Sequence, residues 1–426
     1  MITNFYANNF KSLIDFGFPL SKLTVLIGMN GSGKTTILQA FDFAARMMVG
    51  DIDGWLGNRG WTGSDLTSKL QTQRNIGLRV KFKFDDAAQS TKAQWNGTFN
   101  YTKLACTHET ATITEFVQNP YSFNIRPWLQ VHDGSYRILE WAPGKVSKND
   151  YNKITFTYQG SILSQIREKD IPAPLLRIRD HLRNIRSLEL ISPHLMRQKT
   201  RGDSDDVGFG GERLSAFLAT IKGEQKTALM AALKQFYPNL VDIKASAIKG
   251  GWKRLSIVED FDGRQIETEA RHINDGLLRI LAVLAQNQTS RSLLIFDEIE
   301  NGVNPELIEK LVKLLINSEQ QILVTTHSPM ILNYLDDDTA IEAVQFVYKN
   351  PSGETRVRRF FDIPRIRQKL TLMGPGEAFV DTDLQALAHE CILDDEEKAR
   401  IGPEQALAEQ AAKSAASKNQ EHAYAD

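Results

Sequence analysis

The stretch GMNGSGKT at residues 28–35 sets three glycines, a lysine and a hydroxyl at a fixed spacing. It fits the pattern G-x-x-x-x-G-K-[ST], follows an apolar strand expected at 23–27 and opens a helix expected at 34–48. Gly28, Gly31 and Gly33 allow backbone N–H groups to turn inward, and the start of the helix adds partial positive charge. A loop of this kind is suited to holding phosphate groups.

The polar side chains of this loop indicate a nucleoside triphosphate with Mg²⁺ rather than a lone phosphate. Lys34 has the length to reach the β- and γ-phosphates, and the Thr35 hydroxyl can ligate the metal ion. We also expect the other polar residues of the loop to contact the nucleotide: Asn30, Ser32 and Thr36. A glycine-rich turn that binds nothing is the alternative, but the strand before it and the helix after it favour a nucleotide site.

A second polar pair follows a buried strand in LLIFDEIENG, residues 293–302. Asp297 could hold Mg²⁺ through its water shell, and Glu298 could polarise the water that attacks the terminal phosphate. A solvated Asp-Glu pair at a strand end is the simpler interpretation when the pair is considered alone. Behind a phosphate-binding loop, the metal and general-base roles are the better prediction.

Two further polar residues complete the predicted site. His327 ends the next apolar strand, in LVTTHSP, and the carboxyl ends of parallel strands meet at one edge of a sheet. We therefore expect His327 to sense the γ-phosphate, although a lone histidine is more often structural. Gln159, in YQGSILSQI, could reach Mg²⁺ or the attacking water, but it could equally be a surface glutamine.

The elements that would hold these residues follow from the hydrophobic pattern. Segments at 76–158 alternate between apolar and polar residues, which predicts antiparallel strands with one solvated face. Residues 161–190 read as helical with interruptions at Pro172 and Pro174, and 50–70 read as an irregular surface segment. Two more helices are expected at 212–221 and 224–237, strands near 254–260 and a helix at 277–287. The helix at 305–316 between two buried strands predicts a βαβ unit.

Composition narrows the class of protein. The chain has 426 residues, 51 Lys and Arg against 52 Asp and Glu, and two cysteines far apart in sequence. These values favour a two-lobed protein of the reducing cytoplasm and give no support from overall charge for nucleic-acid binding. We find no signal peptide and no apolar run long enough to span a membrane.

Five motifs in order along the chain resemble those of ABC-type ATPases of the branch that includes RecF, the SMC heads and the OLD-family ATPase domain. They are 28–35, Gln159–Gly160, NDGLLR at 274–279, FDEIE at 296–300 and THSP at 326–329. NNFKSL at 8–13 resembles the N-terminal turn of the same branch, and the resemblance reaches to about residue 345. It implies hydrolysis of ATP with Mg²⁺ by a homodimer that sandwiches two nucleotides, and it leaves a higher oligomer open.

In that branch, the segment before the Asp-Glu strand is a signature that reads the γ-phosphate of ATP bound to the other protomer. Asn274 and Gly276 would then present a helix start to the partner's nucleotide. The family usually has serine where this chain has Asn274; asparagine can still donate a hydrogen bond, but the change bears on ATP affinity and turnover. Alternatively, Asp275–Gly276 is a turn that begins a buried helix.

The chain also departs from its larger relatives. SMC proteins insert a long coiled coil between their lobes, for which 158–276 leaves no room, and OLD nucleases append a TOPRIM domain with clustered acidic metal ligands. We read the acidic triplets at 336–338 and 381–383 as loop or cap residues. The compact form resembles ATPase subunits of bacterial anti-phage defence that act beside a separate effector, and LMGPGEAFVDTDL at 372–384 resembles a segment of that subgroup.

Two arginine-rich segments could contact DNA. Arg179, Arg183 and Arg186 would share one face of a helix, and 356–367 holds a second cluster. Solvated basic faces are the more common outcome for such patterns.

The predicted fold is α/β: an ABC-ATPase head with a P-loop parallel sheet, an antiparallel β lobe and an inserted helical lobe. The expected division is 1–160 for the P-loop and antiparallel region, 161–270 for the helical lobe, 271–345 for the signature, Asp-Glu and histidine core, 346–393 for a cap and 394–426 for a tail that begins as a frayed helix and is then disordered. The expected function is that of a cytoplasmic ATPase that acts with a separate nuclease or toxin. The alternatives are a RecF-like DNA-repair clamp, a transporter ATPase and a scaffold that scarcely uses its ATP.

Overall fold

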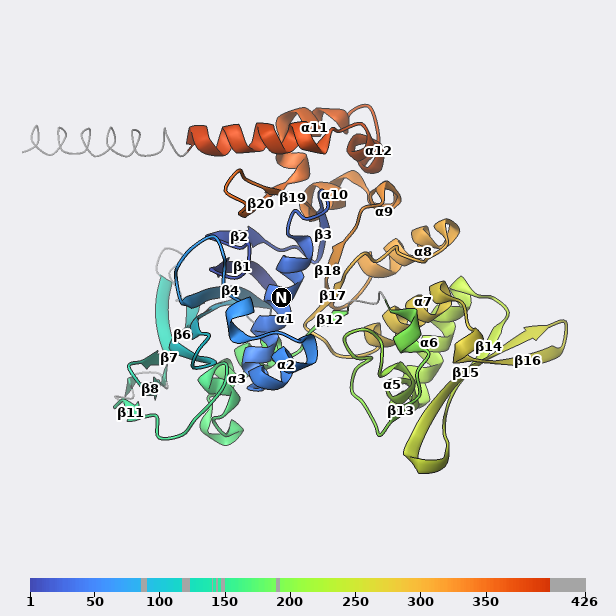
Figure 1. The fold of residues 1–426 in the computed structure, drawn as a ribbon, viewed down its shortest axis with the longest axis horizontal. Helices are drawn as coiled ribbons and strands as arrows, with labels where there is room; N and C mark the ends of the chain where they lie inside the picture. The colour runs from blue at the N-terminus through green and yellow to red at the C-terminus, as the bar shows by residue number, and fades with distance from the viewer. Residues whose placement is uncertain are drawn as a thin grey trace, which may run out of the picture.

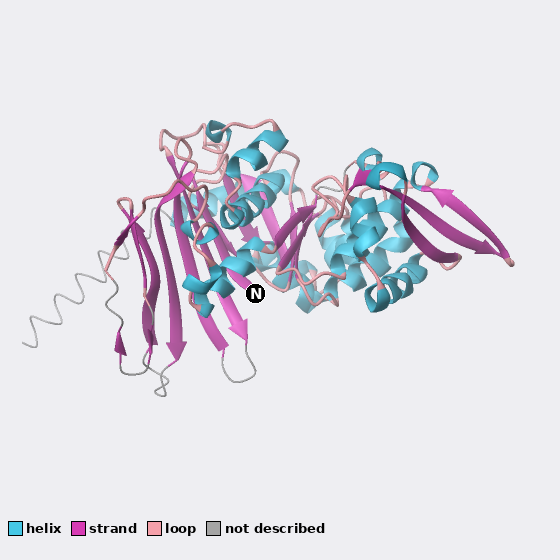
Figure 2. Cartoon of the chain, turned by 90° about the horizontal axis from the view of Figure 1, so that it is seen from below, coloured by secondary structure: helices cyan, strands magenta, loops and turns pink. Residues whose placement is uncertain are grey.

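The computed structural model describes residues 1–85, 90–116, 123–139, 141–142, 145–146, 150–188 and 192–398. Two large sheets and the helices between and around them build the body of the molecule (Figure 1). A third part, which carries a smaller sheet, extends to one side of this body, as Figure 2 shows. Among the described residues, none of the helices combines the length and the apolar character that crossing a bilayer requires.

The central sheet holds the predicted nucleotide-binding elements. In the described part of the chain its order is β12-β17-β18-β3-β19-β20, and neighbours run parallel except for the last pair. All residues of β17 and β18 are buried, as a parallel sheet covered on both faces requires. Its strands are β3 (Leu23–Ile27), β12 (Ile185–Leu188), β17 (Leu293–Phe296), β18 (Gln321–Thr325), β19 (Val344–Lys349) and β20 (Thr355–Arg359). Helix α8 (Pro305–Ile316) joins β17 to β18, which confirms the βαβ unit.

The second large sheet is antiparallel, as the alternating pattern predicted. Along β4, buried and outward-facing side chains alternate for the length of the strand. The described strands, in spatial order, are β11 (Asn152–Lys153), β8 (Ser135–Ile138), β7 (Phe123–His132), β6 (Ala105–Phe116), β5 (Ser90–Asn100), β4 (Asn75–Asp85), β1 (Ile2–Asn8) and β2 (Phe16–Pro19). The short strands β9 (Trp141–Ala142) and β10 (Lys145–Val146) pair with each other.

Helix α1 (Lys34–Val49) lies between the two sheets. One cluster of buried side chains joins it to the inner face of the antiparallel sheet and to the central strands. Phe5 of β1 stacks on Phe41 of α1 with ring centroids 3.9 Å apart. Because α1 begins with the P-loop lysine, the packing of α1 against β1 also holds the P-loop in place.

The lateral part combines helices with a small antiparallel sheet. The two predicted helices are confirmed as α5 (Leu214–Thr220) and α6 (Gly223–Phe236), and the predicted signature helix as α7 (Asp275–Asn287). The sheet pairs β15 (Trp252–Phe261) with β14 (Leu240–Ala247), β13 (Thr200–Arg201) and β16 (Arg264–Glu269). A short helix, α4 (Pro193–Met196), precedes β13.

Three predictions from the sequence were wrong, and they concern residues 50–70 and 161–190. Residues 50–70 are not irregular throughout, because 52–59 form helix α2 (Ile52–Arg59), whose Trp55 is buried. Residues 161–190 are not helical throughout, because α3 (Ala173–Arg183) ends before 185–188, which form strand β12 and pair with β17. Arg186 therefore lies on β12 and shares no helical face with Arg179 and Arg183.

The C-terminal part covers one end of the central sheet. It comprises α9 (Pro329–Asn333), α10 (Asp337–Ala343), α11 (Pro364–Lys369), α12 (Pro375–Val380) and a helix at 384–398 (Figure 1). That helix continues past residue 394, where we expected a frayed helix followed by a disordered tail. Residues 399–426, the rest of the predicted tail, lie outside the described residues.

Candidate functional site

The P-loop follows β3 in a conformation that only glycine adopts readily. Gly28 has φ = +147° and Gly33 has φ = +110°. A Cβ atom on Gly28 would lie 2.1 Å from the Val347 carbonyl oxygen, and one on Gly33 would lie 2.2 Å from the Thr355 hydroxyl. The two glycines are therefore required both by the backbone conformation and by the close approach of β19 and β20.

Lys34 is buried at the first position of α1. Its Nζ donates hydrogen bonds to the carbonyl oxygens of Gly28 at 2.8 Å and Met29 at 3.0 Å. Burial lowers the pKa of Lys34 to about 8, although Asp297, Glu298 and Glu300 act in the opposite direction. The ammonium group thus lies inside the loop that is expected to receive phosphate.

Asp297 is held next to the P-loop by two hydroxyl groups. Thr35 Oγ1 donates to Asp297 Oδ2 at 3.1 Å, and Thr325 Oγ1 donates to Asp297 Oδ1 at 2.5 Å. These oxygen atoms are the ligand type that Mg²⁺ prefers. Ser32 adds a buried hydroxyl that has no hydrogen-bond partner among the described residues. The residues therefore fit a magnesium ion with bound phosphates.

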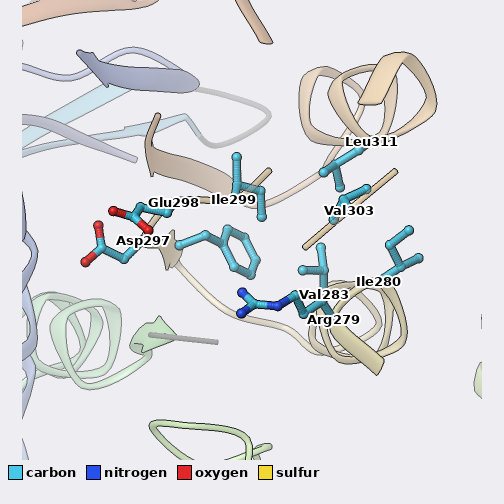
Figure 3. A pocket seen from close by; sticks show the side chains of 9 residues that line it. Arg279, Ile280, Val283, Asp297, Glu298, Ile299, Val303 and Leu311 are labelled. Atoms are coloured by element: carbon cyan, nitrogen blue, oxygen red, sulfur yellow. The ribbon is translucent and has the colours of Figure 1, made fainter. Parts of the chain in front are cut away.

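Glu298 follows directly in a strained conformation. Its φ is +46°, a region that costs a residue with a side chain roughly 1–3 kcal/mol. Its backbone N–H donates to Thr325 Oγ1 at 2.8 Å, and Asn301 Nδ2 donates to its carboxylate at 3.3 Å. Figure 3 shows the carboxylates of Asp297 and Glu298 on the same side of the strand end. The strained backbone of Glu298 therefore lets two consecutive residues direct their carboxylates to the same side of the strand end.

His327 follows β18 at the same edge of the sheet. Partial burial, and then the charge of Lys34, lower the pKa of His327, so its imidazole is neutral at neutral pH. His327 lines an open cavity of about 200 Å³ at this edge. The other lining residues come from the P-loop, the Asp-Glu pair and two further segments: Ser12, Asn30, Gly31, Gly33, Lys34, Thr35, Thr36, Asp297, Glu298 and Lys349.

Sequence reasoning missed three residues of this cavity and its wall. Lys349 is the last residue of β19, which lies beside β3. An apolar strand that ends in a lysine could have indicated this residue as part of the site. Ser12 lies in the NNFKSL turn, where the resemblance gave no role to the hydroxyl. Thr355 donates to the Ser32 carbonyl oxygen at 3.0 Å and lies 2.8 Å from the Ser12 hydroxyl. It braces the P-loop from β20, a contact without any local sequence signal.

Gln159 is not brought together with the other predicted residues. Its side-chain oxygen accepts hydrogen bonds from the N–H groups of Ile52 at 2.8 Å and Asp53 at 2.9 Å, and its nitrogen donates to the Asp53 carboxylate. The amide therefore satisfies the start of helix α2. Since both ends of the amide are occupied there and the residue does not line the cavity, this geometry does not support the metal role expected from the sequence.

Asn274 and Gly276 lie at the start of α7 and do not line the cavity of their own chain. Asn274 is exposed, and its side chain accepts from the Leu277 N–H at 2.8 Å, which caps the helix. A Cβ on Gly276 would lie 2.8 Å from the Gly302 carbonyl oxygen, in the loop after the Asp-Glu pair. The helix start thus contacts that loop from one side and presents Asn274 to the outside.

Most arginines of the two proposed basic surfaces face carboxylates of their own chain. Arg179 is buried and pairs with Glu168 and Asp180 at 2.8 Å. In the second cluster, Arg358 pairs with Asp394 and Asp395. Others in these clusters pair as well: Arg186 with Asp206, Arg356 with Glu354, Arg365 with Glu390 and Arg367 with Asp362. These contacts reduce the positive charge that either segment offers to DNA.

The acidic triplets at 336–338 and 381–383 are cap and loop residues, as predicted. Asp336 accepts from the Thr339 N–H at 2.8 Å at the start of α10. Asp383 accepts from the N–H groups of Gln385 and Ala386 at the start of the helix at 384–398. The carboxylates of Asp336 and Asp383 therefore cap the helices that follow them.

Residues 23–333 match the family model described as "AAA domain, putative AbiEii toxin, Type IV TA system". The chain belongs to this family. The matched range is well over half of the chain and contains the P-loop, the Asp-Glu pair and His327. The protein is an ABC-type P-loop ATPase of the branch that its motifs indicated, and members of that class bind ATP with Mg²⁺.

Comparison with individual proteins gives more limited likenesses. An OLD nuclease of Thermus scotoductus is 33% identical over 113 residues, which are 26% of this chain and 19% of that protein. The match thus spans about a fifth of the relative's length. An SMC head domain from Thermotoga maritima shares 12% identity with a TM-score of 0.43, over 84% of this chain and 98% of that one. An SMC head of Pyrococcus furiosus, solved with a domain of ScpA, shares 12% with a TM-score of 0.45, over 87% and 99%.

Proposed function

We propose that this protein binds ATP with Mg²⁺ between two copies of the chain and hydrolyses it. The observation that carries the proposal is the convergence of Lys34, Thr35, Asp297, Glu298 and His327 on one cavity. Lys34 and Thr35 begin the helix that follows β3 and the P-loop, and the other three residues follow β17 and β18. The segments after three neighbouring parallel strands thus together supply phosphate binding, metal ligation and a general base.

The roles follow from the contacts of each side chain. Lys34 would exchange its two carbonyl partners for the β- and γ-phosphates, and Thr35 and Asp297 would hold the metal. Mg²⁺ supplies positive charge against the phosphate oxygens when it is bound. Glu298 would accept a proton from the water that attacks the γ-phosphorus, which releases ADP and phosphate. His327 would donate its N–H to the γ-phosphate oxygen.

The position of Asn274 supports a dimer. It is exposed at the start of α7 and absent from the cavity of its own chain, so it can act on a nucleotide only when that nucleotide is held by another chain. A helix start is suited to this, since it carries partial positive charge. We therefore propose that two chains enclose two nucleotides, each bound by the P-loop of one chain and α7 of the other.

We further propose that the ATPase regulates a separate nuclease or toxin in bacterial anti-phage defence, acting in the cytoplasm. The family description names a toxin of a toxin–antitoxin system, and the curated relative is named as a nuclease. A RecF-like clamp that grips DNA directly is the alternative. The ion pairs of Arg179 and Arg358 do not favour it.

Glu298→Gln tests the catalytic proposal. Glutamine keeps the size of the side chain but cannot accept the proton, so we expect ATP hydrolysis to fall about 100-fold or more while ATP binding persists. ATP should then hold the variant as a dimer, which light scattering after chromatography measures. Wild-type turnover in this variant would exclude Glu298 as the base. Lys34→Ala is the matched control, since it should lose ATP binding itself.

A further inference from the structure

Glu300 lies three residues after Asp297, outside the set of cavity-lining residues, and yet it contacts the segment that carries His327. One oxygen, Oε1, accepts hydrogen bonds from the backbone N–H groups of His327 at 2.9 Å and Ser328 at 3.1 Å. The other oxygen, Oε2, is buried and has no hydrogen-bond partner within the described residues. A partly buried carboxylate is therefore committed to two consecutive backbone groups of another strand end.

The N–H of His327 depends on this carboxylate more than its neighbour does. Ser328 N also donates to Thr326 Oγ1 at 2.9 Å, so it has a second acceptor within its own turn. For His327 N, Glu300 is the one acceptor found in the described part of the chain. Glu300 thus holds the backbone at the point from which the imidazole enters the cavity.

The loop that carries Glu300 is itself fixed on both sides. Ile299 N donates to the Thr325 carbonyl oxygen at 3.4 Å, and Val303 N donates to the Glu300 carbonyl oxygen at 3.0 Å. The carbonyl of Gly302 packs against Gly276 at the start of α7. Glu300 is therefore a rigidly supported acceptor, and a change in its side chain would be felt first by the histidine turn that it holds.

We propose that Glu300 is a positioning residue for His327, setting the place and direction from which the imidazole meets the terminal phosphate. This inference rests on the proposed ATPase function. The carboxylate contacts neither nucleotide nor water in this role; it acts through the backbone of the histidine. Its contribution should therefore appear in steps that distinguish ATP from ADP, because only ATP carries the γ-phosphate.

Glu300→Ala should lower kcat for ATP about 10-fold or more, in the range seen when outer partners of site residues are removed, with little change in KM. It should also reduce the preference for a fluorescent ATP analogue over the matching ADP analogue, which is measured without turnover. Glu309→Ala is the matched control, because Glu309 pairs with Lys313 on the exposed face of α8. We expect it to behave like the wild-type protein.

Two conservative variants separate geometry from charge and remain informative if Glu300→Ala does not fold. Glu300→Gln keeps an oxygen acceptor at the same reach without the charge, whereas Glu300→Asp keeps the charge but withdraws the oxygens by one methylene. Positioning predicts that the glutamine variant retains more activity than the aspartate variant. The reverse order would overturn the proposal, since it would assign the effect to the charge.

The decisive measurement is a double-mutant cycle with His327→Ala. If Glu300 acts through His327, adding Glu300→Ala or Glu300→Asp to the His327→Ala protein should change kcat by less than about twofold. Effects that multiply would refute the positioning role, even with an active wild-type enzyme. Failure of the wild-type protein to bind or hydrolyse ATP would instead refute the proposed function, so the two failures are distinguishable.

Discussion

Raising the pH should weaken ATP binding through one residue, Lys34. Burial lowers the pKa of this lysine to about 8 when no phosphate is bound, and the charged form is the one that attracts phosphate. With a pKa of about 8, about nine-tenths of the sites carry the charge at pH 7 and about one-tenth at pH 9. If only the charged form binds, the Kd for ATP rises about 10-fold between these pH values.

The sign follows from proton linkage. Bound phosphates stabilise the ammonium form and raise its pKa, so binding above pH 8 must take up a proton. We expect an uptake of about 0.9 proton per ATP at pH 9 and about 0.1 at pH 7. Calorimetry in buffers with different ionisation enthalpies measures this uptake, and a fluorescent ATP analogue measures Kd over the same range. The phosphates of ATP are already largely ionised throughout it.

Lys34→Arg provides the control, because arginine stays charged at every pH used. Its ATP affinity is expected to be lower than that of the wild-type protein but flat between pH 7 and 9. A constant wild-type Kd over this range would refute the reasoning. An equal loss of affinity in Lys34→Arg would show that another group titrates. Circular dichroism at each pH checks that both proteins remain folded.

Two further predictions concern Asn274 and Gln159. Asn274→Asp keeps an acceptor for the Leu277 N–H, since aspartate caps helices as well as asparagine does, but sets a carboxylate against the partner's γ-phosphate. Asn274→Asp and Lys34→Ala should each be nearly inactive alone. An equal mixture of the two proteins should recover about a quarter of wild-type ATPase activity, because half of its dimers carry one intact site. A mixture that stays inactive and does not dimerise with ATP contradicts the two-chain site. Gln159→Ala should cost about 1 kcal/mol of stability by removing the acceptor at the start of α2, measured by urea unfolding, and leave the Mg²⁺ dependence of hydrolysis unchanged. A large rise in the Mg²⁺ requirement would restore the metal role for this glutamine.

The central part of the site could be predicted because its information is local. The backbone conformation of the P-loop requires glycine at positions 28 and 33, and a continuous apolar run before Asp297 or His327 indicates a buried strand. Once two such strands lie side by side and parallel, their carboxyl ends must meet. The prediction that Asp297 and His327 share an edge therefore needed only strand order.

The remaining features depend on contacts between distant segments. The spacing of Leu182, Ile185 and Leu188 suits a helix, and only pairing with β17 makes 185–188 a strand. Helix α2 contains Gly54 and Gly57, which disfavour helices, but the burial of Trp55 and its hydrogen bond to Asp42 outweigh this tendency. Nothing in the sequence around Gln159 indicates which backbone N–H groups will donate to its side-chain oxygen.

The order of strands in the central sheet has a consequence for synthesis on the ribosome. Strand β3 is buried at all five positions, but its two neighbours, β18 and β19, are encoded near the other end of the described chain. About 300 residues must be translated between β3 and the first of these neighbours. At a translation rate of about 5–20 residues per second, this takes roughly 15–60 s.

The antiparallel sheet is complete by β11 and can cover one face of α1 during that interval. The P-loop is translated about 300 residues before the walls formed by His327, Lys349 and Thr355. The complete nucleotide site therefore becomes available only after β20 has been translated.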